Sequence, residues 1–405
     1  MTRFLFVVPP LVGHVNPLAA VARELTARGH TVAWAGHPDL VTRLAGAGAR
    51  VFDCAVPGTG LDRPPDLTGP AAFRFLWRDF FVPLADAMAP GVAAAVERFA
   101  PDLVVADQHA VAGGLVAERL GVRWITSAST SAELADPLDG LPKVAVWLAQ
   151  LLAGLRARIG DPSVGGDPRC SPHGVLAFTT PDLVGDPRLP VAPDRIRMVG
   201  PALHTRPADP AFTRPALDGP AVLVTLGTAN ADAGGRFLTE VVGAFAERPH
   251  LRAVVVDPGG LLGADLPGNV AVREHVPQLE LLAEVDAVLC HAGHNTVCES
   301  LWHGVPLVLA PIRDDQPIVA RQVVEAGAGV RIRFGRARSH HIGAALDTVL
   351  DPASGHRAAA GAIARSFRAA GGAAGAADHL ITTATGEDVT GSVGTGAAVH
   401  HATSG

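Results

Sequence analysis

Strand-like apolar runs alternate with helix-like stretches in the first half of the chain. This pattern is typical of parallel strands joined by crossover helices. The expected strands are Arg3–Val8, Thr31–Ala35, Leu103–Ala106 and Val122–Thr126, with a helix over Ala112–Leu120. After the first strand, Asn16 is a favourable helix N-cap and Pro17 suits the first helical position. Gly29 is placed to end that helix.

The alternation restarts at Ala221, which predicts a second parallel sheet. Its expected strands are Ala221–Leu226, Leu251–Val256, Ala287–Cys290 and Pro306–Ala310, and its expected helices are Arg236–Phe245, Asn295–His303 and Gln316–Glu325. A Pro-rich stretch, 201–220, separates the halves. We therefore expect two doubly wound α/β domains that face each other across a cleft, with ligands at the carboxyl ends of the strands.

The boundaries that we expect follow from this pattern. The first domain covers residues 1–203, the linker 204–219 and the second domain 220–365. A helix over 366–385 is placed to cross back to the first domain. The small, polar stretch 386–405 predicts a disordered tail.

Composition and charge narrow the class of protein. Hydrophobic residues make up 48% of the 405 residues, so both domains can bury a core. The net charge of -6 leaves no basic surplus for a nucleic acid partner. Four cysteines imply no disulfide framework and fit a reducing compartment. No apolar run reaches the roughly 20 residues that span a bilayer. We therefore expect a cytoplasmic protein without stable membrane insertion.

Two common enzyme classes lack their motifs here. A dehydrogenase needs Gly-x-Gly-x-x-Gly after the first strand and an acidic residue after the second. The chain has Pro9-Pro-Leu-Val-Gly-His14 and Ala35-Gly-His37 at these places. It also has no Gly-x-Ser-x-Gly elbow of a serine hydrolase.

The strongest chemical signal follows the expected strand Ala287–Cys290. The segment reads His291-Ala-Gly-His-Asn-Thr296, then Glu299, Gly304, Pro306, Pro311 and Asp314-Asp-Gln316. A helix N-terminus binds phosphate through its free N–H groups and partial positive charge. Gly293 allows close backbone approach. The alternative is a tight turn whose polar groups only cap a helix. Cys290, His291, His294 and Cys298 match no common zinc spacing, so we expect no metal.

A candidate general base follows the first strand in Gly13-His14-Val15-Asn16-Pro17. Histidine titrates near neutral pH and can take a proton from an alcohol. A carboxylate can orient it and stabilise the imidazolium. Asp107, at the end of the strand after Pro101, is the candidate, and His109 is a nearby competitor for the base. Taken alone, each of these residues also fits a loop or capping role.

Residues 291–316 resemble the donor-binding signature of the UDP-glycosyltransferase superfamily, the family 1 enzymes of the two-domain GT-B fold, here of the bacterial natural-product type. Val276-Pro277-Gln278 and Leu281-Leu282 extend the match, and the architecture extends it over about residues 1–385. The resemblance implies that the first domain binds the acceptor, that His14 is the base and that Asp107 supports it. Its implied donor-binding residues are Gly227, Thr228, Val276, Gln278, His291, Gly293, Asn295, Thr296, Glu299, Asp315 and Gln316.

The resemblance further implies an inverting, metal-independent transfer of a hexose, with UDP-glucose as the first donor considered, to a hydroxyl of an apolar acceptor. No cofactor is expected beyond this co-substrate, and the protein is expected to be a monomer or a homodimer. Aromatic residues in two apolar segments are candidates for acceptor binding: Phe75, Trp77, Phe81 and Trp147. His275 stands where plant members carry a base-stacking Trp. The alternatives are a dTDP-deoxysugar donor and a non-catalytic accessory protein on the same fold.

Overall fold

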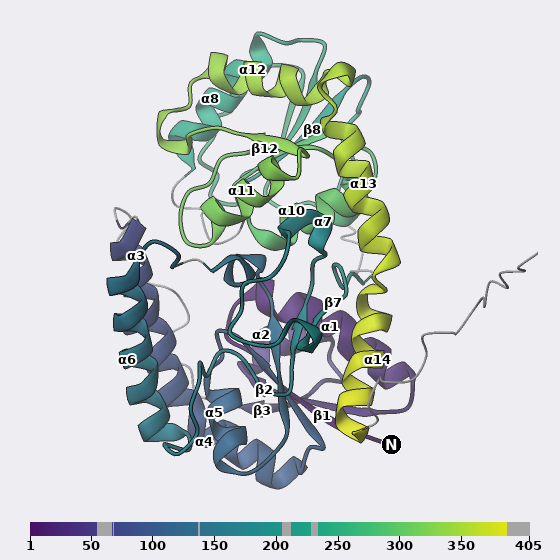
Figure 1. Ribbon diagram of the computed structural model, residues 1–405. Coiled ribbons are helices and arrows are strands. Elements are labelled where there is room, and N and C mark those ends of the chain that lie inside the picture. The colour runs from purple at the N-terminus through teal and green to yellow at the C-terminus, as the bar shows by residue number, and fades with distance from the viewer. Residues whose placement is uncertain (55–66, 68, 137, 205–211, 228–233, 387–405) are drawn as a thin grey trace, which may run out of the picture.

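The chain forms two parallel-sheet domains, one above the other in Figure 1. The computed structural model describes residues 1–54, 67, 69–136, 138–204, 212–227 and 234–386. The predicted tail from 387 onward and residues 205–211 of the predicted linker lie outside these residues. The predicted fold class, two doubly wound α/β domains, is confirmed.

The first sheet has seven strands in the order β3-β2-β1-β4-β5-β6-β7, and all of its neighbouring strands are parallel. Its strands are β1 (Arg3–Val7), β2 (Thr31–Gly36), β3 (Arg50–Asp53), β4 (Leu103–Asp107), β5 (Trp124–Ala128), β6 (Val175–Ala177) and β7 (Ile196–Met198). Its helices are α1 (Val12–Ala27), α2 (Pro38–Ala45), α3 (Gly69–Phe75), η1 (Leu76–Phe81), α4 (Val82–Phe99), α5 (Ala112–Arg119), η2 (Ser131–Ala135), α6 (Pro142–Ile159), α7 (Pro181–Val184) and η3 (Pro193–Arg195).

The second sheet has six parallel strands in the order β10-β9-β8-β11-β12-β13. Its strands are β8 (Ala221–Thr225), β9 (Arg252–Val256), β10 (Val270–Arg273), β11 (Ala287–Cys290), β12 (Leu307–Leu309) and β13 (Gly329–Arg331). Its helices are α8 (Gly235–Ala246), α9 (Gln278–Leu281), α10 (His294–Trp302), α11 (Gln316–Glu325), η5 (Phe334–Arg336), α12 (Ser339–Leu350), η6 (Pro352–Ser354) and α13 (His356–Ala369). The sequence predicted α11 at its observed bounds, and α8 and α10 to within a residue.

Each sheet reverses its strand order once, and the functional loops follow the strands at that point. In the first sheet β1 lies beside β4, with Val7 opposite Ala106. In the second sheet β8 lies beside β11, with Thr225 opposite Cys290. A crevice opens at such a switch point because the connections leave in opposite directions. The loops that begin after β1, β4, β8 and β11 therefore meet between the domains.

The first helix begins earlier than the sequence predicts. Asn16 and Pro17 were expected at its N-cap and first position, but α1 starts at Val12 after Leu11, and Pro17 lies inside it. The Asn16-Pro17 pair resembles a helix start, but five helical residues, 12–16, precede the proline. Its end is as predicted, since α1 stops at Ala27 and Gly29 takes a positive φ of 82°.

The C-terminal segment joins the two domains along one side of the molecule (Figure 1). One helix was predicted over 366–385, but the structure has α13 and then α14 (Gly372–Thr385), with a break at Gly371, where φ is 95°. Ala376, Ala377 and Leu380 of α14 are buried in the same apolar cluster as Leu18 of α1. The chain thus returns to the first domain after completing the second.

One helical stretch, Gly69–Phe99, is long and apolar enough to cross a membrane by length and composition, with a mean hydropathy of 1.3. The sequence analysis expected no such run. Half of its most apolar window is buried inside the protein. Trp77, Leu84, Met88 and Val92 of this stretch lie in the core against the first sheet, as in a core helix of a water-facing domain.

Candidate active site

A cleft with a volume of about 380 Å³ lies between the two domains. The first domain contributes Val12, Gly13, His14, Asn16, Ser129 and Thr130. The second domain contributes a longer set that includes Gly227, Asp257, His275, Val276, Gln278, His291, Gly293, Asn295, Thr296, Glu299 and Asp315. The cleft therefore brings the predicted base together with most of the predicted donor residues.

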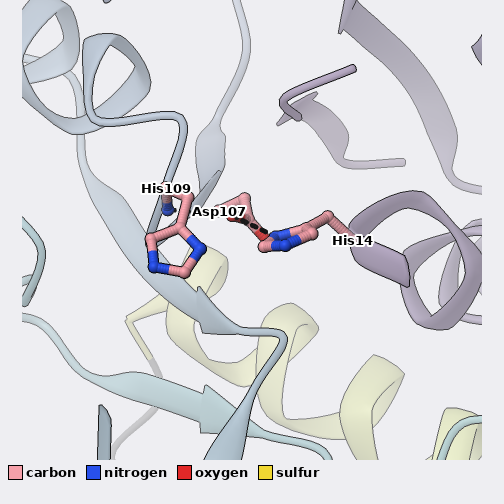
Figure 2. Close-up of side chains that lie close together, drawn as sticks. All are labelled: His14, Asp107 and His109. Carbon is pink, nitrogen blue, oxygen red and sulfur yellow. Dashed lines mark hydrogen bonds and ion pairs between the residues drawn. The ribbon is translucent and has the colours of Figure 1, made fainter. Parts of the chain in front are cut away.

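His14 and Asp107 form a hydrogen-bonded pair on the first-domain side of this cleft (Figure 2). The Nδ1 atom of His14, in the first turn of α1, lies 2.9 Å from Oδ1 of Asp107, at the end of β4. The Asp107 side chain is fully buried, whereas 15% of the His14 side chain is exposed. Because Nδ1 faces the carboxylate, Nε2 is the ring nitrogen left to act on a substrate.

Ser129 is a second partner of the same nitrogen, with its Oγ 2.7 Å from Nδ1 of His14. The sequence analysis missed this residue. Its signal was the polar run from Ser129 to Ser131, which follows β5, the strand beside β4. Ser129 is buried, so its contact restricts the orientation of the His14 ring.

The environment sets the charges of the pair. Burial lowers the pKa of His14, but the charge of Asp107, the hydrogen bond to it and the charge of Asp315 raise it further, so its pKa lies above the usual value. Burial raises the pKa of Asp107, but the charges and hydrogen bonds of His14 and His109 together outweigh this effect and leave its pKa below the usual value. The carboxylate thus stays ionised and stabilises an imidazolium.

His109, the competing candidate, lies beside this pair rather than replacing it. Its backbone N–H donates to Oδ1 of Asp107 at 2.9 Å, and its ring centre is 5.1 Å from that of His14. The ring stacks on Phe81 at 4.5 Å, and its Nε2 lies 3.7 Å from the Glu133 carboxylate. Burial raises the pKa of Glu133, but the charge of Arg169 together with the hydrogen bond and charge of His109 lowers it to about 2.

His14, Asp107 and His109 also have the residue types of a transition-metal site. Their ligand atoms lie within 4.8 Å of one another, and Figure 2 draws the three side chains together. Nδ1 of His14 and Oδ1 of Asp107 are already engaged with each other. A metal ion bound through these two atoms would replace their hydrogen bond.

The predicted diphosphate loop follows β11 and opens α10. Burial lowers the pKa of His291 to about 4, so its imidazole is neutral and contributes hydrogen bonding rather than charge. A Cβ at Gly293 would lie 2.3 Å from Nε2 of His291, and a Cβ at Gly227 would lie 2.7 Å from Cε1 of the same ring. The two glycines therefore make room for His291. Ala292, between His291 and Gly293, takes a left-handed φ of 66°. Such backbone conformations concentrate at functional sites.

The predicted ribose and base residues meet in the cleft. Nε2 of Gln278 donates to Oε2 of Glu299 at 2.6 Å. Val276 and Thr296 line the same cleft, and His275 lies there with 65% of its side chain exposed. The amide of Asn295 donates to the Gly13 carbonyl at 3.0 Å. Thr228 lies outside the described residues.

The predicted sugar-binding pair, Asp315 and Gln316, lies at the start of α11. Oδ2 of Asp315 accepts from the Thr130 hydroxyl of the first domain at 2.6 Å. Burial raises the pKa of Asp315 above its usual value. Oε1 of Gln316 accepts from the backbone N–H groups of Ile312 and Arg313 at 2.9 and 3.0 Å. Gln316 therefore shapes the loop before α11, while Asp315 lines the cleft.

The candidate acceptor residues are more buried than a pocket lining requires. Trp77 and Phe81 are 1% and 4% exposed and belong to the core. Both rings contact the His109 ring, so they form the wall behind it. Phe75 and Trp147 are half-buried. Contact of these four residues with an acceptor stays a prediction.

Comparisons with known proteins agree with this site. The family described as UDP-glucoronosyl and UDP-glucosyl transferase matches residues 213–359. The 4'-demethylrebeccamycin synthase of Lentzea aerocolonigenes is 32% identical, over 86% of this chain and 92% of its own. The solved structure of the glycotransferase of kitacinnamycin has a TM-score of 0.77 and 28% identity, over 94% of this chain and 98% of its own.

A spinosyn rhamnosyltransferase solved with thymidine diphosphate shares the fold, with a TM-score of 0.73 and 22% identity over 94% of this chain and 100% of its own. The two-domain fold and the inter-domain cleft define a GT-B glycosyltransferase. This chain belongs to the UDP-glucoronosyl and UDP-glucosyl transferase family, among its bacterial natural-product glycosyltransferases.

Proposed function

We propose that this enzyme transfers a hexose from a nucleotide-sugar to a hydroxyl of an apolar natural product, with His14 as the general base. The observation that carries this proposal is the His14–Asp107 hydrogen bond of 2.9 Å at the mouth of the donor cleft. A base must lie within hydrogen-bond reach of the proton that it removes, and the exposed edge of His14 faces the same cleft as the donor loop.

The reaction is a single displacement. Nε2 of His14 takes the acceptor's hydroxyl proton, and the oxygen forms a bond to the anomeric carbon on the face opposite the nucleotide. The bond from that carbon to the diphosphate oxygen breaks, and its electron pair leaves with the diphosphate. The configuration inverts. Asp107 stabilises the imidazolium through the step.

The leaving diphosphate needs positive partners, which the N-terminus of α10 supplies. Its free N–H groups and partial positive charge favour an anion, and Asn295 and Thr296 lie in its first turn on the cleft side. Because burial keeps His291 neutral, that residue acts as a hydrogen-bonding group. This chemistry requires no metal ion, and we propose a metal-independent reaction.

The donor's identity is tested with a panel. UDP-glucose leads because Asp315 lines the cleft as an acceptor for sugar hydroxyls, and dTDP-glucose and a dTDP-deoxysugar join it because a relative of the same fold binds thymidine diphosphate. Each donor is incubated with apolar polyphenol and macrolide alcohols in the presence of a chelator. A hexose mass increment on an alcohol supports the proposal. Tight nucleotide binding without any product, over the whole panel, would count against it.

A further inference from the structure

The first helix carries a proline where a proline is costly. Pro17 lies inside α1, in its second turn. A proline within a helix has no N–H for the carbonyl four residues earlier, and its ring crowds that carbonyl. Here the carbonyl belongs to Gly13, the residue directly before His14. The Gly13 carbonyl, in the peptide bond between Gly13 and His14, therefore has no N–H donor at position 17 of the helix.

The Gly13 carbonyl takes its hydrogen bond from the other domain instead. Nδ2 of Asn295 donates to it at 3.0 Å across 282 positions of sequence, in a partly buried setting. Backbone carbonyls that leave water need a partner. The bond joins the first turn of α1 to the first turn of α10, which is the turn that follows the diphosphate loop.

The Asn295 amide has a second N–H group. Asn295 and Thr296 line the inter-domain cleft at the end of α10 that attracts anions. One N–H of Asn295 thus reaches the first turn of α1, next to His14, while the other remains for a phosphate oxygen. The same side chain can therefore contact both the donor and the backbone that carries the base.

We propose that Asn295 is a positioning residue that couples the docked donor loop to His14 through the Gly13 carbonyl that Pro17 leaves free. When the domains close, the amide fixes the first turn of α1 and with it the direction of the imidazole. When they separate, that carbonyl loses its donor and the turn relaxes. The consequence for catalysis rests on the proposed role of His14, whereas the coupling between Pro17 and Asn295 does not.

The direct test is Pro17→Ala, which touches no substrate. The new N–H competes for the Gly13 carbonyl, so we expect kcat to fall about fivefold, the equivalent of one net hydrogen bond, with the KM for the donor unchanged. The matched control is Pro90→Ala in α4, an exposed proline inside a helix that does not line the cleft. It should leave kcat and KM unchanged.

A double-mutant cycle with Asn295→Ala separates coupling from general damage. If both changes act on one hydrogen bond, Pro17→Ala causes no further loss of kcat in the Asn295→Ala background. It should also raise the Tm of that variant, because it restores an N–H donor to the Gly13 carbonyl. Additive losses of kcat would overturn the inference. So would a Pro17→Ala variant with full kcat and a normal melting curve.

A failure of the proposed base gives a different result. In that case His14→Ala keeps its turnover, while the cycle between Pro17 and Asn295 remains non-additive in Tm. If the Pro17 variant folds poorly by circular dichroism, Asn295→Ala probes the same bond from the second domain. The Asn295→Ala variant should then lose more kcat than one lost phosphate contact explains. The change in nucleotide Kd measures that contact.

Discussion

Nδ1 of His14 lies 2.9 Å from Oδ1 of Asp107, although the two residues are 93 positions apart in the chain. The first sheet explains this proximity. β1 and β4 are neighbours at the point where the strand order reverses. His14 follows β1 and Asp107 is the last residue of β4, so both lie at the carboxyl edge of the sheet. The second sheet repeats the arrangement with Gly227 after β8 and His291 after β11.

The pair predicts an acid limb in the pH profile of kcat/KM. His14 must be unprotonated to accept a proton, and its pKa lies above the usual value. The rate should therefore fall as the pH drops through that raised pKa. Asp107→Asn removes the charge that raises the pKa, while the burial that lowers it remains. The limb should move to lower pH, and kcat should fall roughly tenfold or more because the imidazolium loses its stabilisation.

Measuring both profiles with saturating donor checks this shift. An acid limb that stays at the same pH in the Asp107→Asn variant would show that another group controls it. The control Glu133→Gln addresses the neighbouring carboxylate, which faces His109 at 3.7 Å and not His14, and should leave the limb in place.

Gly293→Ala should disable the diphosphate loop. The added Cβ would lie 2.3 Å from Nε2 of His291, so the buried ring must leave its position. We expect the Kd for the nucleoside diphosphate to rise at least tenfold and the free energy of unfolding to drop by about 1–3 kcal/mol. Isothermal titration calorimetry and denaturant unfolding measure the two effects.

The control is Gly268→Ala, where a Cβ meets nothing within 4 Å. It should bind nucleotide as the wild type does. An equal loss of affinity in both variants, or none in Gly293→Ala, would contradict the assigned role of His291.

Thr130 should matter for the sugar rather than for the nucleotide. Its hydroxyl donates to Oδ2 of Asp315 at 2.6 Å across the domains and lowers the pKa of a carboxyl that burial raises. Thr130→Val removes that bond, so Asp315 becomes a poorer acceptor for a sugar hydroxyl. We expect about fivefold weaker binding of UDP-glucose with unchanged binding of UDP.

Thr130→Ser keeps the hydroxyl and should behave as the wild type in the same titrations. If Val and Ser variants bind both ligands alike, Asp315 does not need Thr130 to hold the sugar.

The sequence predicted the two sheets and the ends of β4 and β11 because these strands are continuous apolar runs buried on both faces. Asp107 and His291 could therefore be placed at strand ends without coordinates. The start of α1 could not be placed. Asn16-Pro17 has the local signature of a helix start, but Pro17 lies inside the helix. The Gly13 carbonyl, which the proline leaves without a helical donor, accepts a hydrogen bond from Asn295, 282 positions away.

Other parts of the site were hidden for the same reason. Ser129 and Thr130 acquire their roles only when β5 lies beside β4 and the domains face each other. Position 227 needs glycine because a Cβ there would collide with the ring of His291, which follows a strand far away in the sequence. Local sequence patterns carry no such long-range distances.

The most direct test of the central claim is the rate of sugar transfer by His14→Ala, with nucleotide affinity measured on the same sample. A general base contributes roughly 10²–10⁴-fold, so we predict a loss of at least about 100-fold in kcat while the Kd for the nucleoside diphosphate stays within about twofold. Transfer within about tenfold of the wild type by a well-folded His14→Ala protein would contradict His14 as the base.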